Sequence, residues 1–225
     1  MGGEDWDNVG KPKELPKMLL DADDSQLVLV DYQARLMPVI FENEVVIANA
    51  MRLARIARVM QVPVFGTLQN ADGLGPMVAE LGAAIEAAGG KTLDKMHFNG
   101  VADGLGDWLR PPVRKPTQGG NARSLPKHMQ KPQPTEDDEG RRTIVIAGCE
   151  AHVCLMQTAL GLLEDEFDVW VVTDACSSRS ERNRDAAFDR LAGAGAELVT
   201  TEMVAFEWLG SAEHPAFKEV LALVK

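Results

Sequence analysis

The sequence predicts an α/β fold, in which a mostly parallel sheet is covered by helices on both faces. Short, continuous apolar runs such as QLVLVD (26–31) and TIVIAG (143–148) are typical of strands buried on both faces. Segments with apolar residues three and four positions apart alternate with these runs, as helices do in such folds. The chain has 225 residues, 45% of them hydrophobic, which suits a single domain with its own core.

The first half of the chain begins with a polar stretch, residues 1–24, which we interpret as an N-terminal leader. The domain itself is expected at 25–225 and starts with the strand at 26–31. An amphipathic helix follows, because Val46, Ala50, Leu53, Ile56 and Met60 recur at helical spacing. After it we expect a strand at 62–70, a helix within 73–90 that glycines close, an extended segment at 91–100, and a helical turn or two near Trp108.

The stretch from about 110 to 142 differs in composition from its surroundings. It contains six prolines, few large apolar residues and clustered charges. Such a segment cannot bury enough apolar surface to offset its ordering entropy, so we interpret it as a mobile insert in the domain. Regular structure resumes beyond it: strands are expected at 143–148, 167–175 and 197–200, and helices at 150–166, 181–196, 201–209 and 215–225.

Composition excludes several classes of protein. A formal net charge of −11 disfavours a nucleic-acid partner, because neutralising phosphates requires a surplus of Lys and Arg. No run of eighteen apolar residues occurs, so we expect no membrane span. Three cysteines, an odd number, fit a reducing compartment better than a disulfide framework, and the polar N-terminus lacks a signal-peptide pattern. We therefore expect a cytoplasmic protein.

The stretch GCEAHVCLM (148–156) raises the question of chemistry, since it holds two of the three cysteines. A metal site is disfavoured, because the chain has no CxxC pair and Cys176 stands apart. A disulfide between Cys149 and Cys154 would need extended geometry where a strand-to-helix turn is expected. Two interpretations of Cys154 stay open. It is either a nucleophile in the first helical turn, where N–H groups favour a thiolate and an oxyanion, or an ordinary buried cysteine.

Two charged residues elsewhere in the chain favour the nucleophile. A thiol near neutral pH is only partly ionised and benefits from a base and a nearby cation. Asp31 ends the first strand and is poorly explained by packing, and Lys95 lies next to the apolar Met96 and Phe98. Ligands of parallel sheets bind at the carboxyl ends of the strands, a rule that selects Asp31, the polar residues Thr67, Gln69 and Asn70, and the stretch 148–156.

Four motifs, LVLVDYQ, LDKMHFNG, GCEAHVCLMQTALGLL and VVTDACSSRS, resemble in order and spacing those of the isochorismatase-like cysteine hydrolases. The C-terminal part is most similar to the subgroup of isochorismatase-domain-containing proteins. The resemblance covers 25–109 and 143–225. It implies a Rossmann-like three-layer α/β/α fold with a six-stranded, mostly parallel sheet. It also implies a homo-oligomer, a dimer or larger, that needs no cofactor.

The resemblance also assigns roles to single residues. It implies a catalytic triad of Asp31, Lys95 and Cys154, in which Asp31 takes the proton of the thiol and Lys95 favours the thiolate. The backbone N–H groups of Glu150 and Cys154 would form the oxyanion hole. A non-proline cis peptide is implied between Cys149 and Glu150, a bond that costs roughly 3 kcal/mol and marks functional sites.

The substrate implied by the resemblance is a small molecule with an amide-like C–N bond. Members that bind a metal have added histidines after the second strand, whereas LQNADGLGP here has none, so no metal is expected. Gln33, Gln69 and Phe98 are the candidate residues of the substrate pocket. The alternative is a catalytically silent member that serves as an interaction or redox-sensing module through Cys154.

Overall fold

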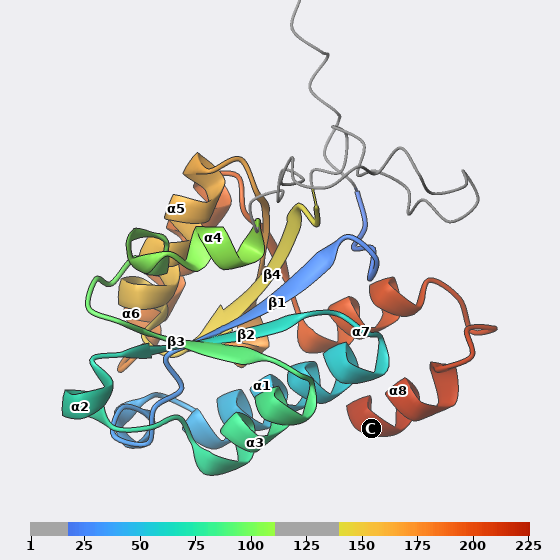
Figure 1. Cartoon of the computed structure of the whole chain (residues 1–225), viewed down its shortest axis with the longest axis horizontal. Coiled ribbons are helices and arrows are strands. Elements are labelled where there is room, and N and C mark those ends of the chain that lie inside the picture. The colour runs from blue at the N-terminus through green and yellow to red at the C-terminus, as the bar shows by residue number, and fades with distance from the viewer. Residues whose placement is uncertain (1–17, 111–139) are drawn as a thin grey trace, which may run out of the picture.

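The computed structural model describes residues 18–110 and 140–225, and within these a six-stranded parallel sheet forms the centre (Figure 1). The strand order β3-β2-β1-β4-β5-β6 places β1 beside β4, where the order reverses. This confirms the predicted Rossmann-like fold. The strands are β1 (Ser25–Val30), β2 (Val64–Gln69), β3 (Lys91–Lys95), β4 (Thr143–Gly148), β5 (Asp168–Val172) and β6 (Glu197–Val199).

Helices cover both faces of the sheet, which completes the three layers. Helices α1, α3, α7 and α8 lie on one face, and α4, α5 and α6 lie on the other (Figure 1). All residues of β1 and β4 are buried, so the core is centred on these two strands. The helices are α1 (Asn43–Val59), α2 (Ala71–Leu74), α3 (Ala79–Ala87), α4 (Leu105–Leu109), α5 (Met156–Glu164), α6 (Glu181–Gly193), α7 (Thr201–Leu209) and α8 (Phe217–Val224).

The apolar spacing in α1 has the predicted effect. Val46, Ala50, Leu53 and Ile56 are all buried, and Met60, just beyond the end of the helix, is half-buried against the core. The helix therefore attaches to the sheet through one apolar face.

The helix expected within 73–90 is α3, which follows Gly75 and Pro76, and the short helix α2 precedes this pair. Gly75 adopts a left-handed conformation with φ of 78°, and Pro76 follows it, so α2 ends before this pair. Met77 then forms an isolated antiparallel bridge with Gln33 before α3 begins. The interruption connects the loop after β1 to the loop after β2.

The predicted leader and insert lie mainly outside the described residues, but their inner ends belong to the fold. Leu20 is buried in the core, and its N–H donates a hydrogen bond to the carboxylate of Glu207, so the ordered domain begins before the predicted boundary at residue 25. The Gln26 amide donates to the carbonyl oxygens of Leu109 and Arg141, both at 3.1 Å. The two ends of the insert therefore lie close together, a geometry that tolerates long insertions.

Gly148, the last residue of β4, allows β1 and β4 to approach each other. A Cβ atom at this position would lie 2.7 Å from Val30 Cβ and 2.8 Å from Val30 O. We expect Gly148→Ala to lower the free energy of unfolding by about 1–3 kcal/mol, measured by urea denaturation. Gly193→Ala, in α6 with nothing near its added Cβ, is the control and should be neutral or slightly stabilising. Equal stability of Gly148→Ala and wild type would contradict this packing argument.

Candidate active site

The carboxyl ends of β1 and β4 meet where the strand order reverses, and each is followed by a residue in left-handed conformation. Asp31 follows β1 with φ of 56°, and Glu150 follows β4 after Cys149 with φ of 49°. Left-handed conformations are uncommon for residues other than glycine and cluster at functional sites. Both turns direct the chain out of the sheet at the edge where ligands bind in this class of fold.

Asp31 and Lys95 form a buried ion pair. Lys95 Nζ lies 2.8 Å from Asp31 Oδ2, and both side chains are at most 1% exposed. Thr67 Oγ1 donates to the other carboxylate oxygen at 2.6 Å, and Lys95 also donates to Gln69 Oε1 at 2.7 Å. Buried charges persist only when they are paired and hydrogen-bonded, as here. The structure thus brings together the ends of β1, β2 and β3 through their side chains.

The thiol of Cys154 lies beside this pair. Its Sγ is 3.8 Å from Gln69 Oε1, and the residue is 3% exposed. Burial, then the negative charge of Asp31, raises the pKa of the thiol to about 12, while Lys95 opposes this rise. The thiol is therefore protonated at neutral pH. Lys95 lowers this pKa, which is the direction that the resemblance implies, but the loss of hydration outweighs its positive charge. The role of Lys95 in a reaction stays a prediction.

Gln69 connects the cation to the thiol. Its Nε2 donates to Met96 O at 2.8 Å, which directs Oε1 toward Lys95 and Cys154. Its backbone N–H donates to Gln33 Oε1, so the main chain is held as well. Gln69 therefore lies next to the thiol, and its role in a substrate pocket stays a prediction.

The other two candidate pocket residues differ from each other. Gln33 is fully buried, and its amide group is used by backbone groups: Nε2 donates to Gln69 O and Gly75 O, and Oε1 accepts from the Gln69 N–H. Gln33 therefore braces the loops and does not present its side chain to a substrate, which corrects its assignment to the pocket. Phe98 is 50% exposed, and its carbonyl oxygen lies 3.5 Å from Lys95 Nζ.

The turn after β4 departs from the expected backbone. The described residues contain no cis peptide bond, so the bond between Cys149 and Glu150 is trans and the expectation of a cis bond is wrong. The left-handed Glu150 turns the chain instead, and the trans form of a non-proline bond is favoured by about 3 kcal/mol. The Cys149 thiol donates to Asp31 O at 2.8 Å, and burial raises its pKa well above its usual value. Cys149 thus joins the two turns.

The carboxylate of Glu150 is in an ion pair, whereas its backbone N–H has no acceptor among the described residues. Its Oε1 lies 2.9 Å from Arg179 Nε. No acceptor for the backbone N–H of Glu150 occurs in the part of the chain that the structure describes. The expected use of this N–H and that of Cys154 as an oxyanion hole stays a prediction.

Several site residues were given no role from the sequence. Thr67, which holds Asp31, was visible only as a polar residue near a strand end. His152 Nδ1 lies 3.0 Å from Ser178 Oγ, and its Nε2 lies 3.4 Å from the Asn183 amide. Burial is the main cause of the lowered pKa of His152, so its ring is neutral at pH 7. Ser178 and Arg179 lie in the motif VVTDACSSRS, whose Ser-Arg pair was the available signal.

Neither a metal cluster nor a membrane-spanning helix was found in residues 18–110 and 140–225. No three His, Cys, Asp or Glu side chains gather there in a way that could hold a metal ion. None of the helices described is long and apolar enough to cross a membrane.

The chain is similar to several known proteins. The sequence profile of the isochorismatase domain family matches residues 135–203. Isochorismatase domain-containing protein 2 of Bos taurus is 35% identical over 201 residues, 89% of this chain and 83% of the relative. The structure of MAR1 ribonuclease from Caenorhabditis elegans is 30% identical with a TM-score of 0.76, and 92% of each chain is covered.

Two structures of YcaC are also similar, each with 26% identity. YcaC from Pseudomonas aeruginosa, described with hexane-2,5-diol and covalent acrylamide, has a TM-score of 0.73 and covers 93% of both chains. YcaC from Escherichia coli, described as an octameric hydrolase of unknown specificity, has a TM-score of 0.70. The match covers 92% of this chain and 97% of the YcaC chain.

Proposed function

Because the chain belongs to the isochorismatase family, we propose that it is a hydrolase that cleaves a small amide-like C–N substrate with Cys154 as the nucleophile. The observation that carries this proposal is the position of the Cys154 thiol beside the buried ion pair of Asp31 and Lys95. Burying two charges next to a thiol costs free energy, and packing alone does not explain such an arrangement.

In the proposed reaction, Asp31 accepts the thiol proton as Sγ attacks the carbonyl carbon. Proton transfer coupled to attack suits a thiol whose pKa is about 12, because a free thiolate is scarce at neutral pH. Lys95 keeps Asp31 in place and offsets part of the negative charge that develops on sulfur. The N–H groups of Glu150 and Cys154 would bind the oxyanion.

The second half of the reaction returns the enzyme to its starting state. The tetrahedral intermediate collapses, the C–N bond breaks, and the amine leaves with the proton that Asp31 had accepted. A water molecule then gives a proton to Asp31 and attacks the thioester, which releases the acid and restores the Cys154 thiol. No oxidant or reductant is needed for this balance.

The relatives support the proposal at the level of the fold and its chemistry. One YcaC protein is described as a hydrolase, and the other carries covalent acrylamide, a reagent that adds to nucleophiles. The octameric state of the Escherichia coli protein supports our proposal that this chain forms a homo-oligomer, a dimer or larger. We further propose that it acts in the cytoplasm.

The test is a panel of small amides and carbamoyl compounds, with release of ammonia or amine as the readout. At least one compound is expected to be hydrolysed by the full chain and not by protein whose thiols have been alkylated under forcing conditions. No hydrolysis across a broad panel would overturn the proposal.

Two other functions of this chain are considered beside amide hydrolysis. Redox sensing through Cys154 is disfavoured, because sensor cysteines are exposed and have lowered pKa values, whereas this one is buried with a raised pKa. RNA cleavage is a second candidate because of the name of the Caenorhabditis elegans relative. The net charge of −11 opposes RNA binding, and an RNA substrate in the panel separates the two activities.

Replacement of Asp31, the proposed base, should make the Cys154 thiol easier to ionise and at the same time slow turnover. The Asp31 carboxylate raises the pKa of Cys154 and Lys95 lowers it, so Asp31→Asn should bring this pKa below about 12. Alkylation of Cys154 by iodoacetamide at pH 9 is then expected to be at least about fivefold faster than in wild type, while turnover falls at least about 100-fold.

The control for this experiment is Asp189→Asn, an exposed carboxylate on α6. It should leave both rates unchanged. Peptide mapping assigns the alkylated cysteine, and circular dichroism checks the fold of each variant. Slower alkylation in Asp31→Asn than in wild type would contradict the electrostatic account.

A further inference from the structure

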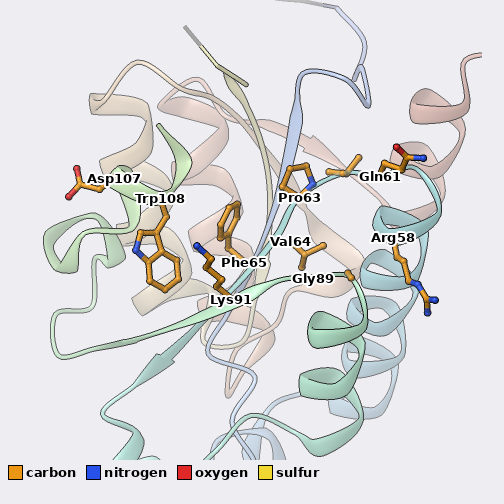
Figure 2. A pocket seen from close by; sticks show the side chains of 11 residues that line it. Arg58, Gln61, Pro63, Val64, Phe65, Gly89, Lys91, Asp107 and Trp108 are labelled. Carbon is orange, nitrogen blue, oxygen red and sulfur yellow. The ribbon is translucent and has the colours of Figure 1, made fainter. Parts of the chain in front are cut away.

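A cleft lies at the end of the sheet opposite to Cys154. It opens at the amino ends of β2 and β3, whose carboxyl ends hold Gln69 and Lys95. Its volume is about 640 Å³, which lies in the range of small-molecule sites. Figure 2 shows that Phe65, Lys91 and Trp108 lie together on one side of this cleft.

The aromatic side of the cleft is held firmly. The rings of Phe65 and Trp108 are 6.3 Å apart and inclined by 48°. Trp108 is only half-buried, but its helix α4 is anchored by the buried Leu105 and Leu109 on either side of it in the sequence. A half-buried, fixed indole offers a face on which a planar ring can stack at low entropic cost.

The polar groups of the cleft are mainly cationic. Lys91 Nζ lies 5.9 Å from the centroid of the Trp108 ring, and Arg58 lies across the cleft near Gln61 (Figure 2). Within residues 18–110 and 140–225, neither cation is in an ion pair with a carboxylate. Asp107 is the carboxylate at the rim.

We propose that this cleft binds a planar aromatic anion, that is, a flat ring system carrying a carboxylate or phosphate group. The ring would stack against Trp108 and Phe65, and the anionic group would contact Lys91, the cation beside Trp108. The binding energy combines burial of the ring with charge-assisted hydrogen bonds, each of which is modest alone. The proposal is independent of the reaction proposed for Cys154.

The test uses three probes with the same ring, titrated calorimetrically into the full chain at pH 7. The anions 2-naphthoate and 2-naphthyl phosphate are expected to bind with at least one Kd below about 1 mM, and neutral 2-naphthol at least tenfold more weakly. The tighter of the two anions identifies the preferred group. Absence of saturable binding by both anions, or equal binding by 2-naphthol, would overturn the proposal.

Variants place the ligand in the cleft. Lys91→Met should weaken binding of the anion at least about fivefold, whereas Lys218→Met, an exposed lysine on α8, should not change it. Cys154→Ala should also leave binding unchanged, because Cys154 lies at the other edge of the sheet. Binding that is lost in Cys154→Ala and kept in Lys91→Met would place the anion beside the thiol and contradict the proposal.

Discussion

Cys154→Ala is expected to lower turnover of the amide substrate at least about 1000-fold and to leave the fold intact. The thiol is the group proposed to form the covalent bond, and removal of a nucleophile from such a catalytic unit commonly costs three orders of magnitude or more. Steady-state kinetics with the best compound of the panel measure the loss, and thermal unfolding checks the fold.

Cys176→Ala is the matched control. Cys176 is also a buried cysteine, and burial raises its pKa to about 12, but it follows β5, and the charge that adds to this rise is that of Asp174 rather than Asp31. Its replacement should change turnover less than about threefold. Comparable losses in both variants would indicate a general effect of removing a buried thiol.

Lys95→Met is expected to cost both stability and activity. It leaves the Asp31 carboxylate buried without its cation, and removal of one partner of a buried ion pair typically destabilises a protein by about 3–5 kcal/mol. Urea denaturation should show this loss, and turnover should fall at least about 100-fold because the proposed base and the developing charge lose their counterion.

The double variant Asp31→Asn/Lys95→Met separates the charge from the shape of the site. It removes both charges, so it should be more stable than Lys95→Met alone, while remaining inactive. The exposed Lys218→Met should match the wild type in stability. A Lys95→Met variant as stable as wild type would show that the two charges do not depend on each other.

The sheet and the position of Asp31 at its carboxyl edge followed from the sequence for one physical reason. Parallel strands buried on both faces appear as continuous apolar runs, and the polar residue that ends each run lies at the same edge of the sheet. Asp31, the last residue of QLVLVD, illustrates this rule, whereas Lys95 ends the mostly exposed edge strand β3 and was joined to the site by the resemblance to a known family. The resemblance to a known family then supplied the roles.

The environment of the thiol could not be predicted in the same way. The pKa of Cys154 depends on the balance of burial, Asp31 and Lys95, and a local motif shows only that a helix begins nearby. The same holds for Gln33, which has the polarity of a pocket residue. Backbone groups of Gln69 and Gly75 form hydrogen bonds with the Gln33 amide, and only the folded chain shows this.

The turn after β4 shows a further limit. Residues Ala151–Leu155 form a π-helical turn before α5, which the apolar spacing of the sequence does not indicate. Leu155, Ala159 and Leu162 are buried in the core, whereas Val153 is only partly buried. The backbone of this turn, with its trans bond and left-handed Glu150, is likewise set by contacts between β1 and β4.

The most direct test of the proposed mechanism is detection of the acyl-enzyme. Wild-type protein is quenched in acid during steady-state turnover of the best substrate and analysed by intact mass and peptide fragmentation. We predict a mass increase equal to the acyl group on Cys154, removed by hydroxylamine as expected for a thioester, and absent in Cys154→Ala. Rapid turnover by Cys154→Ala, or an acyl adduct on Cys149 instead, would contradict the assignment of Cys154 as the nucleophile.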